Sequence, residues 1–252
     1  PSSYAPRAIG DPNKGINDVK SIGGRSAAAK RLALLNNLDA NFRKKFNDKG
    51  VNSYNGFYDD ALALMKSKDL KAFDLSEEPA EQRAAYGDNS FGQGCLLARR
   101  LVDSGVRFVE VTHEGWDHHK ALADEMGDVA PVFDQAYATL ITDLKQRGML
   151  DSTLVVVATE FGRKPNFDGD GRSHHPVCFS TVLAGGGAKA GFVYGKSDDA
   201  GYYVDEDPVT VGAFHASIAF AAGMEIEKPA LSPSGRPMTV GDGEEPVLEL
   251  FA

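Results

Sequence analysis

The feature that most constrains the fold is an apolar run from Thr153 to Ala158, which reads Thr-Leu-Val-Val-Val-Ala. Continuous β-branched runs of this kind are typical of strands whose two faces are both covered. A second strand is expected at Val106–Val111, where apolar and polar residues alternate, and a helix from about Val132 to Arg147 lies between the two. This order of elements predicts two neighbouring parallel strands in a layered α/β sheet.

Helical patterns surround this predicted sheet. Apolar residues recur every three or four positions after Ser26, which predicts a helix that ends near Gly50. Further helices are expected at Ser90–Val102 and Val211–Ala222, and a third strand is expected at Val177–Leu183. The chain therefore belongs to the α/β class.

The length of 252 residues suits one large α/β domain with its own core. Residues 1–85 begin with a Pro- and Gly-rich stretch and then turn helical, so we expect an irregular arm and a helical front portion there. Residues 86–252 are expected to form the α/β sheet portion that carries the functional site. The two portions together are predicted to form one structural domain.

Composition excludes several classes of partner. The formal net charge of -9 and the sequence pI of about 5.2 leave no basic surface for a nucleic-acid backbone. No apolar stretch approaches the roughly 20 residues that cross a bilayer. Cys95 and Cys178 are too few for a disulfide framework, so we interpret both as small core residues. We expect neither nucleic acid nor a membrane as a partner.

Histidine placement is the most informative chemical feature. Of six histidines, three lie at positions 113, 118 and 119, and two at positions 174 and 175. The first cluster directly follows the strand predicted at Val106–Val111, and ligands in open α/β sheets bind outside the carboxyl ends of strands. The second cluster precedes its strand, so it reaches the same edge only if Val177–Leu183 runs antiparallel. His215, beside the apolar stripe of the last helix, is interpreted as structural.

These residue types indicate a divalent metal site. Imidazole nitrogens and carboxylate oxygens together suit zinc, manganese or iron, and a catalytic site leaves one position open. Asp117 and His119 share one side of an extended loop, while Glu160 and His174 supply ligands from elsewhere. Arg163 suits an anionic substrate, because a guanidinium forms two parallel hydrogen bonds to phosphate or sulfate. The alternative is that these histidines only cap loops, since an Asp-x-His pair is common by itself.

Three segments closely resemble the motifs GWDTH, EFGRTP and GRDHWP. They are Gly115–His119, Glu160–Pro165 and Gly171–Pro176. The motifs belong to a large bacterial family described as a domain of unknown function and placed in the alkaline phosphatase and sulfatase superfamily. Two departures concern the site: Phe161 stands where the superfamily has a ligating histidine, and Ser173 stands where the family usually has aspartate.

The resemblance implies an alkaline-phosphatase-like three-layer sandwich around a mixed, mostly parallel sheet, with a divalent metal (Zn, Mn or Ca) at the strand ends. Asp117, His119, Glu160 and His174 then take the positions of metal ligands. It also implies export to the periplasm or the cell exterior by a twin-arginine signal. Family members carry early strands and a Ser or Thr nucleophile position that would lie upstream of Pro1. We therefore expect an incomplete domain that is inactive as an enzyme by itself.

The motifs and the ligand chemistry together predict a metal-dependent hydrolase of phosphate or sulfate esters, with Arg163 as the catalytic residue that holds the anionic group. The expected substrate is an anionic small molecule or a glycan ester. The alternative is a non-catalytic domain of the same fold that binds an anionic ligand, a sulfated glycan or a protein partner. Fold resemblance does not choose between these two functions, because function depends on the site.

Overall fold

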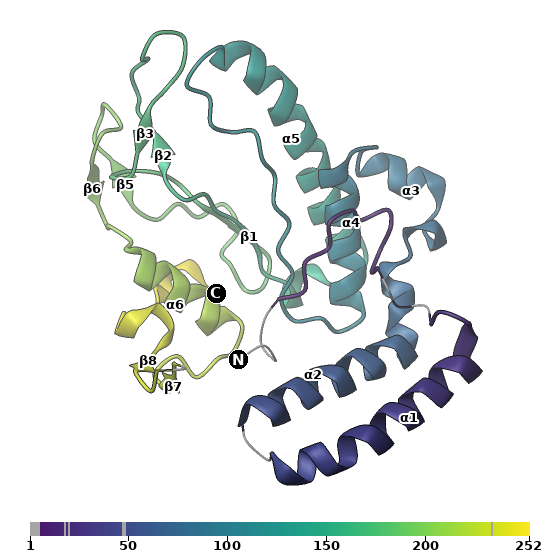
Figure 1. Ribbon diagram of the computed structural model, residues 1–252. Helices are drawn as coiled ribbons and strands as arrows, with labels where there is room; N and C mark the ends of the chain where they lie inside the picture. The colour runs from purple at the N-terminus through teal and green to yellow at the C-terminus, as the bar shows by residue number, and fades with distance from the viewer. Residues whose placement is uncertain (1–5, 18, 20, 47–48, 233) are drawn as a thin grey trace. The chain divides into compact units, whose positions relative to one another are not determined.

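The computed structural model of the chain describes residues 6–17, 19, 21–46, 49–232 and 234–252. The chain divides into two compact units (Figure 1). The first comprises Pro1–Arg83 together with Leu96–Val109, and the second comprises Ala84–Cys95 and Glu110–Ala252. All predicted metal ligands belong to the second unit.

The first unit is helical. Its two long helices, α1 (Gly24–Lys45) and α2 (Lys49–Lys66), lie side by side in Figure 1. After α2 the chain continues through two 3-10 helices and a short α-helix: η2 (Lys68–Phe73), η3 (Leu75–Glu77) and α3 (Ala80–Ala85). Helix α4 (Ser90–Asp103) begins at the predicted residue, Ser90, and contributes its second half to this unit.

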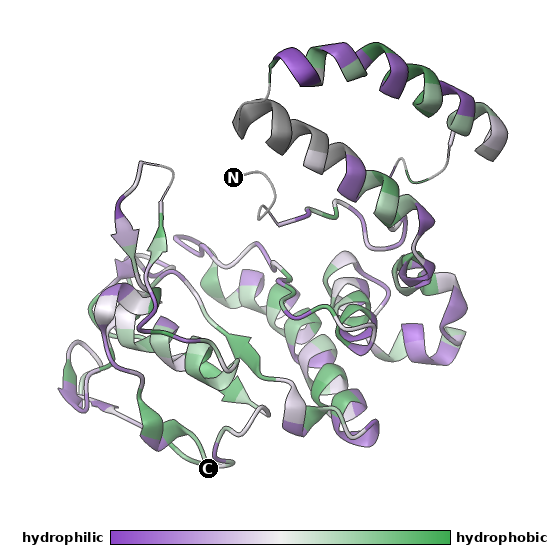
Figure 2. Ribbon diagram, turned by 90° about the horizontal axis from the view of Figure 1, so that it is seen from below, coloured by the Kyte–Doolittle hydropathy of each residue, from purple (hydrophilic) through white to green (hydrophobic). Residues whose placement is uncertain are grey.

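Helix α1 confirms the helix predicted after Ser26, but its apolar stripe is not buried. Leu35, Leu38 and Phe42 of this stripe are spaced three and four positions apart, which places them on one face of the helix. All three are exposed, Leu38 to 69%. Figure 2 shows hydrophobic and hydrophilic residues alternating along α1. The periodicity therefore predicts the helix correctly but does not identify a core.

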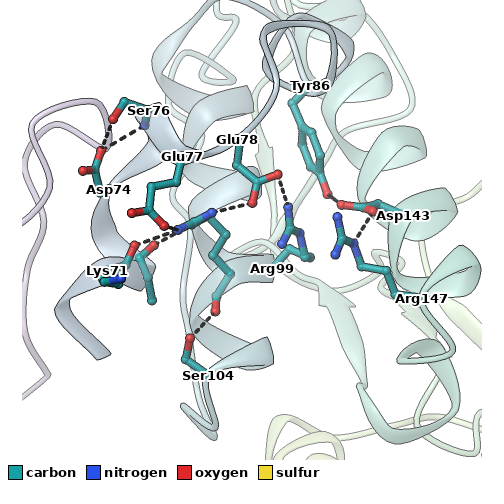
Figure 3. A network of polar contacts seen from close by, with 12 residues as sticks. Lys71, Asp74, Ser76, Glu77, Glu78, Tyr86, Arg99, Ser104, Asp143 and Arg147 are labelled. Carbon is teal, nitrogen blue, oxygen red and sulfur yellow. Dashed lines mark hydrogen bonds and ion pairs between the residues drawn. The ribbon is translucent and has the colours of Figure 1, made fainter. Parts of the chain in front are cut away.

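Buried charges hold α4 against the residues that precede α3 (Figure 3). The carboxylate of Glu78 lies 2.7 Å from Arg99 Nη2 and 2.5 Å from Arg100 Nη1. Arg100 also donates to the carbonyl oxygens of Ala72 (2.8 Å) and Lys71 (2.7 Å). Burial raises the pKa of Glu78, but hydrogen bonds from Arg100 and Arg99 outweigh this and keep the pKa below its ordinary value. Glu78 is therefore ionised, and its carboxylate compensates the charges of Arg99 and Arg100.

The longest helix of the second unit is α5 (Leu122–Gln146). It begins ten residues before the predicted start near Val132. Asp124 and Glu125 lie in its first turn, where negative charge stabilises a helix N-terminus, and Pro131 is accommodated inside it. Although α5 has 25 residues, neither it nor any other described helix is both long and apolar enough to cross a membrane.

Strands of the second unit occur as short antiparallel pairs, followed by helix α6 (Val211–Ala221) near the C-terminus. The pairs are β1 (Val155–Val157) with β4 (Val182–Ala184), β2 (Gly162–Arg163) with β3 (His174–His175), β5 (Lys196–Ser197) with β6 (Val204–Glu206), and β7 (Ala230–Leu231) with β8 (Pro237–Met238). The antiparallel return predicted for Val177–Leu183 is thus confirmed, over a shorter length.

The predicted parallel strands are wrong for the part of the chain that the structure describes, where every strand pair is antiparallel. Val106–Val111 forms no strand, and Phe108 within it is 74% exposed. The expected three-layer sandwich with a mostly parallel sheet is therefore not formed by these residues. Alternating apolar and polar residues allow a segment to form a strand, but a strand also needs a neighbour whose backbone N–H and C=O groups are free to hydrogen-bond with it. β1 finds that neighbour in β4.

The core of the second unit includes a tyrosine with a polar contact. Tyr86 is fully buried together with Ala136 and Leu144 of α5. Its hydroxyl donates to Asp143 over 2.9 Å, and Arg147 Nε donates to the same carboxylate over 2.6 Å, as Figure 3 shows. The residues before α4 are therefore fixed to the C-terminal end of α5.

Glu78→Gln is expected to lower the free energy of unfolding by about 3 kcal/mol, because it removes the charge that compensates two buried arginines. Urea denaturation at pH 7 measures the change. Glu77→Gln is the matched control: Glu77 is 49% exposed and 4.0 Å from Arg100, so its removal should cost less than about 0.5 kcal/mol. Equal effects of the two changes would contradict a central role for Glu78.

Candidate metal site

Three side chains of the second unit converge at one exposed point. Asp117 Oδ1 lies 3.0 Å from His119 Nε2 and 2.9 Å from His174 Nε2. The two imidazole nitrogens are 3.1 Å apart. These three atoms form a nearly equilateral triangle, and all three residues are exposed. We refer to Asp117, His119 and His174 as the triad.

The triad has the dimensions of one face of a metal coordination sphere. With metal–ligand distances of about 2.1 Å, neighbouring ligands are roughly 3.0 Å apart in an octahedron and roughly 3.4 Å apart in a tetrahedron. The observed separations of 2.9 to 3.1 Å fit the octahedral arrangement. Three donors on one triangular face leave the opposite positions open, so the residues present fit a divalent cation with room for substrate.

A buried histidine fixes the loop that carries the first two members of the triad. His118, between Asp117 and His119, is only 4% exposed, whereas both its neighbours are exposed. Its Nδ1 lies 2.6 Å from Oε2 of Glu125 in the first turn of α5. Because alternate side chains of an extended loop face opposite sides, the inward position of His118 keeps Asp117 and His119 outward.

Aromatic packing fixes the residues just before this loop. The His113 ring stacks on Phe91 at a centroid distance of 4.3 Å, and Trp116 lies edge-on to Phe133 of α5. Trp116 Nε1 donates to His113 Nδ1 over 3.1 Å. Burial lowers the pKa of His113, which favours the neutral ring that this hydrogen bond requires. The loop therefore starts from a packed position beside α4 and α5.

The third member of the triad comes from the hairpin of β2 and β3. His174 pairs directly with Arg163 across the hairpin, so their side chains share one face. Phe161, two residues before Arg163, packs its ring against His174 at 4.3 Å between centroids. Phe161 thus supports a triad histidine from the side.

Backbone hydrogen bonds join the hairpin to the triad loop. Arg172 N donates to His118 O over 3.0 Å, and Leu122 N donates to Asp170 O over 3.0 Å. Gly171, between these two contacts, is buried, and a Cβ there would lie 2.1 Å from the carbonyl carbon of His119. Only glycine permits these two segments of the backbone to approach each other this closely.

Electrostatics at the triad centre on Asp117. Arg163 Nη1 lies 2.6 Å from the same Oδ1 that contacts both histidines. Hydrogen bonds from His174 and Arg163 lower the pKa of Asp117 to about 2. The carboxylate is therefore ionised at neutral pH and available as a metal ligand.

The structure brings together three of the four predicted ligands. Placing His174 beside Asp117 and His119 confirms the prediction made from the antiparallel return. Glu160 is exposed and lies outside the triad, so its role as a ligand stays a prediction. Arg163 contacts Asp117 directly.

Sequence reasoning missed two supports of the site. The first is Glu125, whose contact with His118 crosses from the loop to α5. The second is the close approach at Gly171. The sequence indicates this close approach through Gly171 itself, but Gly171 was interpreted only as a residue of the motif at Gly171–Pro176.

One family model, described as "Protein of unknown function (DUF1501)", matches residues 1–251 of the chain. No curated protein and no solved structure matches it. The expected placement in the alkaline phosphatase and sulfatase superfamily therefore rests on the motif resemblance alone.

Gly171→Ala should weaken metal binding by at least about tenfold, because the new methyl group pushes the loop of His119 away from His174. Calorimetric titration with Zn²⁺ or Mn²⁺ measures the affinity. Gly127→Ala in α5 is the control, since nothing lies within 4 Å of the added Cβ. Unchanged affinity in the Gly171 variant would refute the proposed role of this close approach.

Asp117 in the metal-free protein is expected to titrate near pH 2, and His174→Ala should move its pKa toward the ordinary 3.8. Because the folded-state pKa is depressed, the stabilising contribution of Asp117 is present above pH 3.8 and is lost as the pH falls toward 2. Carbon-detected NMR of the side-chain carboxyl group follows both titrations. An identical midpoint in the two proteins would show that His174 does not perturb Asp117.

Proposed function

Because the chain belongs to the family of proteins of unknown function named DUF1501, we propose its function from its own residues: metal-dependent hydrolysis of phosphate or sulfate esters. The observation that carries the proposal is the triad, whose three ligand atoms lie 2.9 to 3.1 Å apart. Such a cluster of two imidazoles and one carboxylate, with open positions opposite, is typical of catalytic metal sites.

Asp117, His119 and His174 would hold the metal, and two imidazoles among three donors favour a transition metal such as zinc or manganese over calcium, which prefers oxygen ligands. When bound there, a divalent metal supplies a Lewis acid that polarises an ester oxygen and makes water more acidic. The ionised Asp117 anchors the cation, and the exposure of the triad lets a substrate reach it.

Arg163 would bind the anionic group of the ester. Its guanidinium lies beside the triad, on the hairpin face that also carries His174. A guanidinium can donate two parallel hydrogen bonds to phosphate or sulfate oxygens, which orients the ester toward the metal. The proposed substrates are anionic small molecules or glycan esters. The motif resemblance also supports export, which would place these substrates outside the cytoplasm.

A second candidate function is binding of an anionic ligand, a sulfated glycan or a protein partner without catalysis. One observation favours it: the Asp117 carboxylate is already compensated by Arg163 at 2.6 Å and by the two histidines. A site of this kind is electrostatically balanced without a metal. In that case the anion would bind to the protein in the presence of a chelator.

Asp117→Asn should reduce the affinity for Zn²⁺ or Mn²⁺ by about 100-fold, and in a protein that also carries the expected Ser or Thr nucleophile it should abolish metal-dependent release of nitrophenol from p-nitrophenyl phosphate or sulfate. Calorimetry and absorbance at neutral pH measure the two effects. Glu160→Gln, measured in parallel, tests the fourth predicted ligand, since only a true ligand lowers the affinity comparably. Metal binding that is unaffected by the Asp117 change would overturn the proposal. Anion binding in a chelator, with no ester hydrolysed, would establish the second candidate.

A further inference from the structure

A second guanidinium on the hairpin of β2 and β3 has no anionic partner among the described residues. Arg172 Nε is buried and has no hydrogen-bond partner. The guanidinium stacks on the ring of Phe167, with Cζ 5.0 Å from the ring centroid. Two carboxylates precede Arg172 on the hairpin, and neither forms an ion pair with it: Asp170 lies two residues before it, and Asp168, four residues before it, accepts a hydrogen bond from the Ser173 hydroxyl over 2.8 Å. Arg172 therefore carries a positive charge that the described part of the protein does not neutralise.

The register of the hairpin places Arg172 on the side of the triad. Arg163 is opposite His174, and Lys164 N donates to Ser173 O over 2.9 Å, so the antiparallel pairing continues toward the tip of the hairpin. Because successive side chains of an extended strand alternate, Arg172 shares the face of His174 and Arg163. Its backbone N–H, on the edge of the strand, is bonded to His118 O, between the two triad residues of the loop.

The charges on this face do not balance once a metal is present. Arg163 is ion-paired with Asp117, whereas Arg172 has no ion-pair partner among the described residues, and a divalent cation would add two further positive charges. A monoanion would leave most of this excess uncompensated, whereas a dianion would remove two charges. At pH 8 a phosphate monoester carries about two negative charges, because its second pKa is about 6, and a sulfate monoester carries one.

We propose that Arg163 and Arg172 form a two-guanidinium clamp that selects dianionic phosphate monoesters over monoanionic sulfate monoesters. This inference rests on the proposed function and narrows its substrate class. Each guanidinium donates to terminal oxygens of the phosphoryl group, and the charge-assisted hydrogen bonds strengthen with the charge of the acceptor. In this arrangement Arg172 binds the anionic group of the substrate, and the triad binds the metal.

The experiment compares two non-hydrolysable probes of similar shape, benzylphosphonate and phenylmethanesulfonate, at pH 8.5. Calorimetric titration into the Zn²⁺-loaded protein should show the dianionic phosphonate binding about tenfold or more tightly than the monoanionic sulfonate. Arg172→Gln should weaken phosphonate binding by about tenfold, change sulfonate binding less, and leave Zn²⁺ affinity unchanged. Lys164→Gln is the control, since Lys164 is an exposed cation at a neighbouring position of the same hairpin.

The possible outcomes test the two-guanidinium clamp and the proposed hydrolase activity independently. Equal phosphonate affinity in the wild type and Arg172→Gln overturns the clamp, whether or not aryl esters are hydrolysed. An equal loss in Lys164→Gln also overturns it, because the effect would then come from general charge. A phosphonate preference that depends on Arg172, in a protein that hydrolyses no ester, supports the clamp and overturns only the catalytic part of the proposed function.

Discussion

The site depends on two backbone hydrogen bonds that join segments distant in the sequence, from Arg172 N to His118 O and from Leu122 N to Asp170 O. These bonds hold the loop of Asp117 and His119 next to the hairpin of His174, in addition to the side-chain contacts of Asp117 with Arg163 and His174. Side-chain chemistry supplies the ligands, but main-chain geometry sets their separations. The absence of a side chain at Gly171 is as much a part of the site as the imidazoles are.

Each segment of the site is also fixed separately from within the second unit. The loop is held by the buried His118 and Glu125 and, before it, by the aromatic packing of His113 and Trp116. The early start of α5 has a function here, since it places Glu125 where His118 needs an acceptor. The ligands themselves are exposed, so the precision of the site comes from buried neighbours and not from burial of the triad.

The sequence predicted the convergence of the triad better than it predicted the sheet. Asp117, His119 and His174 could be identified because few chemistries use that combination and because the second cluster requires an antiparallel return. The strand expected at Val106–Val111 does not form. The alternation of apolar and polar residues is a local property of the sequence, whereas strand pairing depends on a partner segment elsewhere in the chain. The start of α5 was predicted ten residues too late, because the apolar pattern begins near Val132 whereas the first turn of the helix carries the acidic residues Asp124 and Glu125. Contacts between distant segments, such as that of His118 with Glu125, leave no periodic pattern to detect.

The separation of the ligands along the chain has a consequence for stability. Asp117 and His174 are 57 residues apart, so an ion bound to both acts as a cross-link that closes a long loop. A ligand that binds only the folded state stabilises it in proportion to the logarithm of its free concentration. Unlike a disulfide, such an ion leaves the unfolded chain unrestricted, and it holds the two segments together only while the protein is folded. With the metal binding proposed above, the supply of metal outside the protein would control how firmly the hairpin and the loop stay together.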